Sequence, residues 1–428
     1  MLGIFLGLVL LMVLAYMGWS IIWIAPVTAG IVALFGGLDL LPAYTDTYMG
    51  GFVGFAKAWF PVFMLGAIFG KLMEDTGAAQ AVAHWITKII GTKRAILGVV
   101  VGAAVLTYGG VSLFVVVFAM YPLAVALYRE ANIPRRLIPG AIALGSFTFT
   151  MTALPGTPQI QNLIPMQYFN TTPTAAPIMG IAGALVMGIG GYFYLIGRQK
   201  KLMAAGEVFT EPKDQDVEEI DESKLPNAFL SFLPLITVIV TLNVFKWDII
   251  TALITGIVLI MLLNMKHLQK FIGSINGGAS GSVIAIINTS AAVGFGTVVK
   301  AVPGFETLKD FVLGIQGSPL ISEAVAVNIL AGATGSASGG MGIALEALGS
   351  KYLEMAISSG IDPAAFHRIA SLASGGLDTL PHNGAVLTLL AITGMTHKDS
   401  YKDIFVVGSL IPIVSVIVAI IFASIGLI

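Results

Sequence analysis

Long blocks without a single Asp, Glu, Lys, Arg or His are the feature that most constrains this sequence. They cover residues 1–38, 95–128, 137–197, 225–245, 271–299 and 404–428. About 20 consecutive apolar residues span a bilayer as a helix, and a helix satisfies its own backbone groups in lipid. The blocks are apolar along their whole length, whereas the strands of an outer-membrane barrel alternate between apolar and polar residues over about 10 residues. An all-α polytopic membrane protein is therefore predicted.

Composition agrees with this class and excludes several functions. Of the 428 residues, 57% are hydrophobic and 11% are charged, whereas soluble proteins carry about 25% charged residues. The net charge of −1 gives no reason to expect a nucleic-acid partner. The chain has no cysteine, so disulfides and thiolate metal ligands are excluded. No cofactor or metal site is expected, and the first block is predicted to be retained and to hold two spans.

Charged residues indicate how the chain is divided and oriented. Basic clusters at 88–94, 129–136 and 198–201 flank apolar blocks and are therefore predicted to face the cytoplasm. Four other basic residues are expected on the outer side: Lys300, Lys309, Lys351 and Arg368. The predicted units are a membrane repeat at 1–197, a charged cytoplasmic linker at 198–226 and a second membrane repeat at 227–428.

Two kinds of irregular segment are predicted in the first half. Block 95–128 lies between two clusters on one side, so it is expected to enter and leave by the same face, turning at Tyr-Gly-Gly 108–110. Such a re-entrant hairpin requires surrounding protein or a watery cavity. The alternative is one tilted helix with a glycine kink. Two prolines around a glycine at 155–158 predict a broken helix.

The same order of signals recurs in the second half. Ser-Gly-Gly at 338–340 is followed by a proline at 363 and by Leu-Pro-His-Asn at 380–383. The step from Gly110 to Pro134 is 24 residues, and the step from Gly340 to Pro363 is 23. Each half is expected to cross the membrane an odd number of times, so the two copies would be inverted relative to one another. The predicted architecture is two inverted repeats with about ten transmembrane helices, two re-entrant hairpins and two broken helices, as in secondary transporters.

Asp378 and His382 are the ionisable residues of the second break. A charge at membrane depth costs about 2.5 to 3.5 kcal/mol on insertion scales, so both are candidates for binding substrate or a proton. His382 titrates near neutrality as a free side chain, and Asp378 is the second candidate. The alternative is that Asp378 caps the half-helix that follows and that His382 packs as a neutral imidazole.

A bound carboxylate also needs hydrogen-bond donors. No lysine or arginine is expected inside the apolar blocks, so the half-helix N-termini and hairpin tips are predicted to supply backbone N–H groups. Oxygen-bearing residues at 288–290 could hold a coupling cation, although hydrogen bonding between helices is the more common role. Glu323 and Glu346 are weaker titratable candidates.

The paired Gly-Gly hairpins, the inverted duplication and the segment 375–390, with Leu-Pro-His-Asn-Gly at 380–384, resemble the gluconate permease (GntP) family, in particular its hydroxybutyrate-permease-like members. The resemblance implies a bacterial inner-membrane symporter that takes up a small hydroxy-acid anion, such as gluconate or 3-hydroxybutyrate, with protons. It also implies membership of the ion transporter superfamily, whose members are commonly homodimers with an elevator motion. Symport of a monoanion with a proton is electroneutral and so does no work against the membrane potential, which agrees with the implied proton coupling.

The resemblance also implies a site. Its substrate-binding residues would be Gly109, Gly110, Pro155, Gly156, Thr157, Gln159, Ser338, Gly339, Thr379, His382 and Asn383. Asp378 and His382 would carry the coupled proton. The hairpin tips lack the Ser-Asn-Thr motif of the sodium-coupled relatives, so sodium coupling is the less favoured alternative. A channel is a more remote alternative, and no nucleophile or nucleotide-binding motif points to an enzyme.

Overall fold

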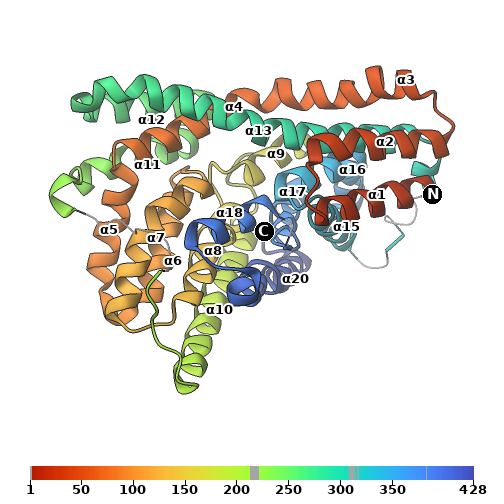
Figure 1. The fold of residues 1–428 in the computed structure, drawn as a ribbon. Helices are drawn as coiled ribbons and strands as arrows, with labels where there is room; N and C mark the ends of the chain where they lie inside the picture. Colours follow the sequence, from red (N-terminus) through yellow and green to blue (C-terminus); the bar gives the residue numbers. More distant parts are fainter. Residues whose placement is uncertain (1, 213–220, 308–313, 316–317, 382) are drawn as a thin grey trace.

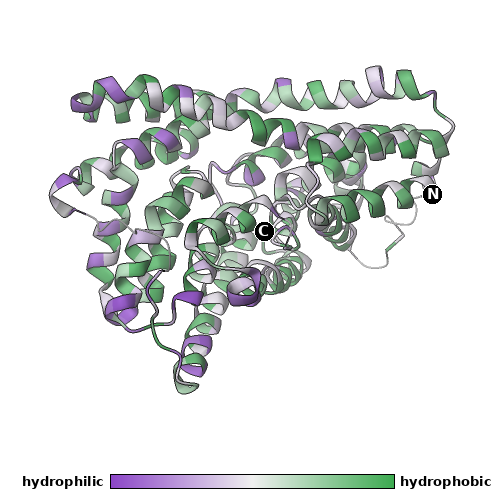
Figure 2. Cartoon of the chain, viewed as in Figure 1, coloured by the Kyte–Doolittle hydropathy of each residue, from purple (hydrophilic) through white to green (hydrophobic). Residues whose placement is uncertain are grey.

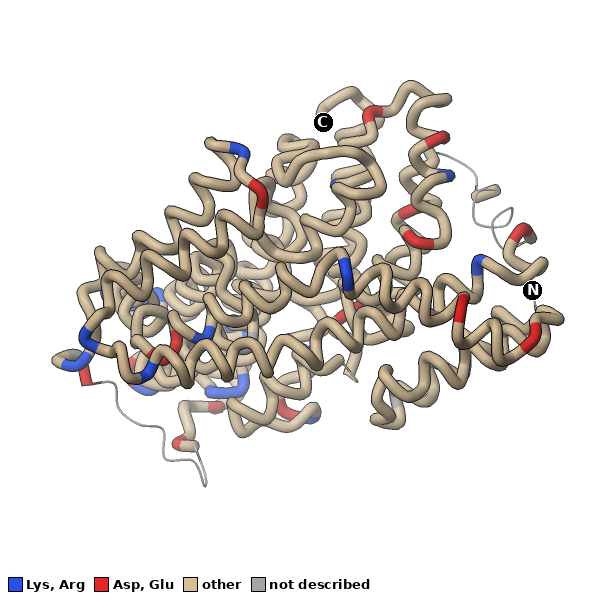
Figure 3. The backbone as a smooth tube through the Cα atoms, turned by 90° about the horizontal axis from the view of Figure 1, so that it is seen from above, with Lys and Arg blue, Asp and Glu red and all other residues tan. Residues whose placement is uncertain are grey.

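The computed structural model describes residues 2–212, 221–307, 314–315, 318–381 and 383–428, which Figure 1 shows as a bundle of helices. Helices and short connections make up this described part, without strands, so the predicted all-α class is confirmed. Hydrophobic residues dominate most helices, and hydrophilic residues gather at several helix ends, as at the lower end of α10 (Figure 2). Acidic and basic residues are sparse along the chain (Figure 3).

The first half contains ten α-helices and four short 3-10 or π turns. The α-helices are α1 (Leu2–Tyr16), α2 (Ile21–Gly36), α3 (Leu40–Pro42), α4 (Met49–Asp75), α5 (Ala78–Ile90), α6 (Ala95–Tyr108), α7 (Leu113–Glu130), α8 (Ile138–Ser146), α9 (Ile160–Phe169) and α10 (Pro177–Ala204). The short turns are η1 (Ala43–Tyr48), η2 (Thr92–Arg94), η3 (Arg135–Leu137) and η4 (Phe149–Ala153).

The described part of the second half also contains long and short helices. Its α-helices are α11 (Ala228–Asn243), α12 (Ile249–Leu263), α13 (Leu268–Ala301), α15 (Pro319–Thr334), α16 (Ala337–Ser359), α17 (Pro363–Ser374), α18 (Gly384–Thr393), α19 (Lys402–Phe405) and α20 (Ile411–Ser424). The short turns are η5 (Glu222–Lys224), η6 (Met265–His267), η7 (His397–Tyr401) and η8 (Val406–Leu410).

Several of these helices are long and apolar enough to cross a bilayer. Four continuous helical stretches in the described part qualify, at Leu40–Asp75, Pro177–Ala204, Met265–Ala301 and His397–Ser424. The pair Ala78–Ile90 and Thr92–Tyr108 qualifies jointly but is bent by 98°. Shorter apolar helices, α1 and α2 among them, account for the two segments expected in the first block. The chain is therefore a multi-pass membrane protein.

Two long helices, α4 and α13, lie side by side across the molecule (Figure 1). Gly278 of α13 permits this close approach, because a Cβ atom there would come within 2.6 Å of the Ile68 Cα atom. Small residues at such contacts let membrane helices pack closely by van der Waals attraction. Helix α2 packs on α13, α12 packs on α4, and α10 packs on α20.

Each half also holds a helical pair with a tight turn. Helices α6 and α7 meet at residues 109–112, where Gly110 has a φ of +95°, so the predicted interruption lies where the sequence places it. In the second pair, α15 ends at Thr334 and the left-handed residue is Gly335, with a φ of +59°. The tip expected at 336–340 therefore begins one residue earlier, at Gly335, and its glycine pair, Gly339 and Gly340, lies in the first turn of α16.

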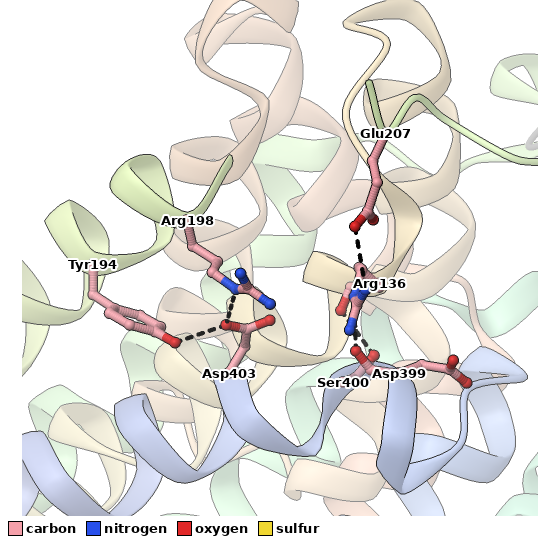
Figure 4. A network of polar contacts seen from close by, with 7 residues as sticks. All are labelled: Arg136, Tyr194, Arg198, Glu207, Asp399, Ser400 and Asp403. Atoms are coloured by element: carbon pink, nitrogen blue, oxygen red, sulfur yellow. Dashed lines mark hydrogen bonds and ion pairs between the residues drawn. The ribbon is translucent and has the colours of Figure 1, made fainter. Parts of the chain in front are cut away.

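A polar network joins the end of α10 and the linker to the last helices (Figure 4). Arg136 Nε donates to the Asp399 carbonyl at 2.8 Å, and an Arg136 Nη atom lies 3.4 Å from Glu207. Asp403, which is fully buried, accepts hydrogen bonds from Arg198 at 3.1 Å and from Tyr194 at 2.7 Å. These contacts fix the start of the linker against η7 and α19.

Candidate functional site

The first break runs from η4 to α9, through residues 154–159, and the α6–α7 turn lies against it. Gln159 Nε2 donates to the Thr107 carbonyl at 2.7 Å. The Tyr108 hydroxyl donates to the Pro155 carbonyl at 3.0 Å. Prolines and glycine remove helical backbone hydrogen bonds here, and the Tyr108 side chain from the tip satisfies the Pro155 carbonyl.

Glycine has a specific function in this break. Gly156 has a φ of +81°, which L side chains rarely adopt. Its N–H donates to the Pro173 carbonyl at 2.8 Å, and its carbonyl accepts from Asn243 Nδ2 at 2.9 Å. The structure thus brings five of the predicted site residues into one cluster, the first break cluster: Gly109, Gly110, Pro155, Gly156 and Gln159.

Thr157 completes the first break cluster with an unused polar group. Its side chain is fully buried, and its hydroxyl has no hydrogen-bond partner among the described residues. The Thr107 hydroxyl at the end of α6 is also buried and also has no hydrogen-bond partner among the described residues. Buried polar atoms without partners are uncommon in native proteins, and hydroxyl groups can both donate to and accept from a ligand.

The second break lies between α17 and α18, and one amide joins it to the α15–α16 turn. Asn383 accepts a hydrogen bond from the Val386 N–H at 2.9 Å and so caps α18. Its Nδ2 atom donates to the Gly335 carbonyl at 2.8 Å. An amide from each break therefore donates to a carbonyl at the tip of a helical pair, in both halves of the chain.

The second hairpin tip is rich in hydroxyl groups. Ser336 caps α16 by accepting from the Gly339 N–H at 3.1 Å, and the Ser338 hydroxyl lies 3.3 Å from that of Thr289. We call this group, together with Asn383, the second break cluster. It includes three of the predicted site residues, namely Ser338, Gly339 and Asn383.

Two other predicted residues have different positions. The Thr379 hydroxyl lies 2.8 Å from that of Ser409 in η8, and the Thr379 carbonyl accepts from Tyr401 at 3.3 Å. Thr379 therefore contacts the last helices and makes no recorded bond to the hairpin tip. His382 lies outside the described residues, so its place in the proton-coupling pair stays a prediction.

Asp378 lies inside the second break with an unused carboxylate oxygen. The residue is 5% exposed, and its Oδ1 atom has no hydrogen-bond partner among the described residues. The alternative in which Asp378 caps the following half-helix is wrong, because Asn383 is the N-cap residue. No group of three or more His, Asp or Glu residues in the described part could hold a metal ion.

Arg368 is the principal residue that the sequence reasoning placed wrongly. It was expected on the outer side, yet its side chain in α17 is fully buried. Its guanidinium donates to the Ala175 carbonyl at 2.7 Å, to the Ala153 carbonyl at 3.2 Å and to Asn162 Oδ1 at 3.0 Å. Arg368 is therefore a basic side chain in the interior, and backbone carbonyls of the first half satisfy it.

His367 and Asn162 extend this arrangement. Asn162 Nδ2 donates to the Thr157 and Pro173 carbonyls at 2.9 and 2.8 Å, which directs its Oδ1 atom toward α17. His367 Nε2 lies 3.2 Å from that oxygen and therefore acts as the donor, while Nδ1 accepts from Thr171 at 2.6 Å. The buried imidazole is thus assigned as the neutral Nε2–H tautomer.

Helix α17 connects the two breaks. The Ser371 hydroxyl donates to the Thr152 carbonyl at 2.7 Å, beside the contact of Arg368 with Ala153. These bonds attach the second broken helix to η4, directly before the first break. Among the described residues, no recorded hydrogen bond joins the two hairpin tips to each other directly. Adjacent His and Arg in an otherwise uncharged stretch, 363–374, are the signal that could have identified this contact.

Comparison with known proteins agrees with a transporter. A Bacillus subtilis (strain 168) protein described as the uncharacterized transporter YxjC is 44% identical over 447 residues, which covers 94% of each chain. The Escherichia coli (strain K12) high-affinity gluconate transporter is 32% identical over 104 residues, covering 24% of this chain and 23% of that one. The Alcanivorax borkumensis YdaH transporter shares the fold, with a TM-score of 0.59, 14% identity and coverage of 91% and 90%.

The family assignment rests on a match along nearly the whole chain. The model of the citrate transporter family, CitMHS, matches residues 3–428. This match confirms that the chain is a transporter, and the relatives named above are transporters as well. It does not confirm membership of the gluconate permease family. The chain belongs to the CitMHS citrate transporter family.

Proposed function

We propose that this transporter is a proton-coupled symporter of a small hydroxy-acid anion that works by elevator-type alternating access. The observation that carries the proposal is the pair of amide bridges, from Gln159 to Thr107 and from Asn383 to Gly335. Interrupted backbone at membrane depth is tolerated only where protein or a water-filled cavity surrounds it. Secondary transporters bind substrate at such interruptions.

The substrate class is supported by the family, by a partial relative and by the residues. Citrate, named by the family, and gluconate, named by the partial relative, are both hydroxycarboxylates. The buried hydroxyls of Thr107 and Thr157 supply donors for such groups. The half-helix N-termini at Ile160 and Gly384 add backbone N–H groups with a favourable dipole for a carboxylate.

The proton is assigned to Asp378 together with His382. Asp378 is buried within a break and keeps an unpartnered oxygen in the described part, and a carboxyl in that setting avoids a desolvated charge by binding a proton. Movement of a monoanion with one proton does no work against the membrane potential, whereas the anion alone would face about 2.3 kcal/mol per 100 mV. Sodium coupling at the hydroxyl-rich tip, near Ser338, is the alternative.

The proposed architecture is a pair of inverted repeats, 1–197 and 227–428, joined by a cytoplasmic linker at 198–226. Support comes from the same order of hairpin and broken helix in both halves. The moving transport domain would contain α6–α9 and α15–α18, and the long helices α4 and α13 would belong to a scaffold. A homodimer in the bacterial inner membrane is part of the proposal, on the strength of the family resemblance.

Uptake into proteoliposomes tests this proposal. Purified protein would be reconstituted, and entry of radiolabelled gluconate, 3-hydroxybutyrate and citrate would be followed under an imposed pH gradient, with and without sodium. We expect accumulation of at least one acid that a protonophore abolishes and that needs no sodium. Accumulation that appears only with sodium would move the coupling site to the hydroxyl-rich tip, and a turnover rate typical of pores would favour a channel.

Replacement of Asp378 separates coupling from binding. Asp378→Asn keeps the shape of the side chain and removes its proton exchange. We expect this variant to lose uptake driven by the pH gradient and to retain exchange of labelled for unlabelled substrate at equal pH. Unchanged gradient-driven uptake in Asp378→Asn, alone and combined with His382→Ala, would remove both residues from the coupling mechanism.

A further inference from the structure

A further carboxyl lies in the interior, outside both break clusters. Glu323 belongs to α15, in the second turn after its N-cap residue Ser318. Its side chain is fully buried, and both carboxylate oxygens lack hydrogen-bond partners among the described residues. Asp378, in contrast, has one unpartnered oxygen. Nothing in the proposed function uses Glu323.

No described positive charge compensates Glu323. Helix α15 packs on α16, α17, α1 and α20, and neither α1 nor α20 contains a charged residue. In α17, Arg368 and His367 bind carbonyl and side-chain oxygens of the first half. In α16, Lys351 pairs with Glu354 at 2.7 Å. Each described charged or imidazole group of these helices therefore has its recorded partners elsewhere.

The two remaining titratable groups of α16 do not bond to Glu323 either. Tyr352 interacts with it electrostatically, but its hydroxyl lies 3.2 Å from that of Ser322. Glu346 accepts from the Tyr168 hydroxyl at 3.3 Å and lies 3.9 Å from Lys300 Nζ. An ionised Glu323 would be an isolated charge in an apolar interior, which proteins avoid by neutralising the group.

We propose that Glu323 is a second proton-binding site of the transport cycle, in addition to Asp378. This inference rests on the proposed proton symport. Glu323 carries its proton in the conformation described here, because a neutral carboxyl is the form that the apolar surroundings accept. Helix α15 packs on α1, and α1 packs on α2, which in turn packs on the scaffold helix α13. A shift of the hairpin against α1 therefore changes what covers α15 and gives Glu323 access to water. Release of the proton then accompanies the conformational change.

The number of protons that enter with each substrate molecule tests the inference. Proteoliposomes with an internal pH-sensitive dye would report proton entry, and radiolabel would report entry of the acid that the wild type accepts. We expect Glu323→Gln to carry one proton fewer per substrate molecule than the wild type. Glu346→Gln is the matched control, because that carboxyl is partly exposed and paired, and it should keep the wild-type ratio.

Separate outcomes distinguish the two proposals. Absence of proton entry with substrate in the wild type would remove the proposed symport itself. Wild-type proton entry with an unchanged ratio in Glu323→Gln would overturn the assignment of Glu323 alone. Should Glu323→Gln fail to fold, Glu323→Met, which is unbranched and uncharged, takes its place in the same measurement.

Infrared spectroscopy gives a second test that needs no variant at position 323. The carbonyl band of a protonated carboxylic acid is resolved from that of a carboxylate. We expect this band at pH 7 in the wild type and, because Glu323 retains its proton, also in Asp378→Asn. Loss of the whole band in Asp378→Asn would show that Glu323 is ionised and would overturn the inference.

Discussion

Arg368 connects the two halves of the chain at the level of a single side chain. Its guanidinium reaches the carbonyls of Ala153 and Ala175 and the amide oxygen of Asn162. Hydrogen bonds to charged groups are stronger than those between neutral groups, and carbonyls left without them pay their full desolvation cost. We therefore assign Arg368 to positioning the first break against α17.

Replacement of Arg368 should accordingly reduce stability. Arg368→Gln is expected to lower the free energy of unfolding by about 2 to 4 kcal/mol, because several buried carbonyls lose their donors. Thermal unfolding in detergent measures this as a lower midpoint. Lys351→Gln, which removes an exposed ion pair with Glu354, should change stability by less than about 1 kcal/mol. Equal midpoints for Arg368→Gln and the wild type would contradict the positioning role.

Asn383 has two functions that substitution can separate. Asn383→Ser keeps a capping oxygen for α18 but cannot reach the Gly335 carbonyl, whereas Asn383→Ala loses both contacts. We expect Asn383→Ser to lose most uptake at nearly wild-type stability, and Asn383→Ala to lose uptake and about 1 kcal/mol of stability in addition. Uptake assays and thermal unfolding of both variants check this. Full uptake by Asn383→Ser would show that the bridge to the hairpin is dispensable.

The sequence allowed some of these residues to be predicted and not others. Prolines and glycines alter local geometry, so the break at 155–158 could be placed from the residues alone. The surroundings of Arg368 could not be predicted, because its acceptors lie 193 to 215 residues away along the chain. Charge counting treats such an arginine as a surface residue, and only the fold shows that carbonyls surround it.

The pair α15–α16 shows how closely its helices pack. A Cβ atom at Gly340 would collide with the backbone of Ala331 and Leu330. Gly340 therefore permits the contact between the helices, while Gly335 makes the turn. A glycine pair in the sequence does not distinguish these two roles, so the sequence alone could not show that Gly335 makes the turn and that Gly340 serves helix packing.

Insertion of one methyl group tests this packing. Gly340→Ala should separate α15 from α16, destabilise the protein by about 1 to 3 kcal/mol and abolish uptake. Gly281→Ala is the matched control, because Gly281 of α13 is also helical but has no neighbouring atom within 4 Å of the added Cβ. Thermal unfolding and uptake would be measured for both. Normal uptake in Gly340→Ala would contradict the close packing of the hairpin.

The start of the linker lies on the end of α7 through an ion pair. Arg129 donates to both carboxylate oxygens of Glu211 at 2.8 Å, and its guanidinium lies 5.8 Å from the centre of the Phe209 ring. Its hydrogen bonds hold the pKa of Glu211 below the usual value of 4.5. A carboxyl with a lowered pKa contributes its attraction at higher pH and loses it as the pH falls through the lowered value.

Proteolysis measures this contact. Glu211→Gln should be cut by chymotrypsin after Phe209 about two to five times faster than the wild type at pH 7, the modest effect of an exposed ion pair. Glu354→Gln, which removes an exposed pair in α16, should leave this rate unchanged. Equal cleavage of Glu211→Gln and the wild type would mean that the ion pair does not hold the linker.

The charge-free blocks determine the class of the whole molecule. They left a helical membrane protein as the remaining possibility, and the structure agrees. The recurrence of turn, proline and break also indicated two related halves. The bias of basic residues next to the apolar blocks predicts an orientation in the membrane. The proposed motion between domains depends on a second conformation, which the local pattern of residues does not encode.

Alternating access of one site built from both breaks is the central claim, and cysteine labelling tests it most directly. The chain has no cysteine, so Thr157→Cys and Ser338→Cys introduce one near-isosteric thiol in each break cluster. Labelling by a membrane-impermeant maleimide would be timed with and without the transported acid, with Ser358→Cys on the exposed end of α16 as control. Alternating access predicts that the acid slows labelling at Thr157→Cys and Ser338→Cys and leaves the control unchanged. Labelling of both break cysteines at the same rate with and without acid, in variants that still transport it, would contradict the shared site.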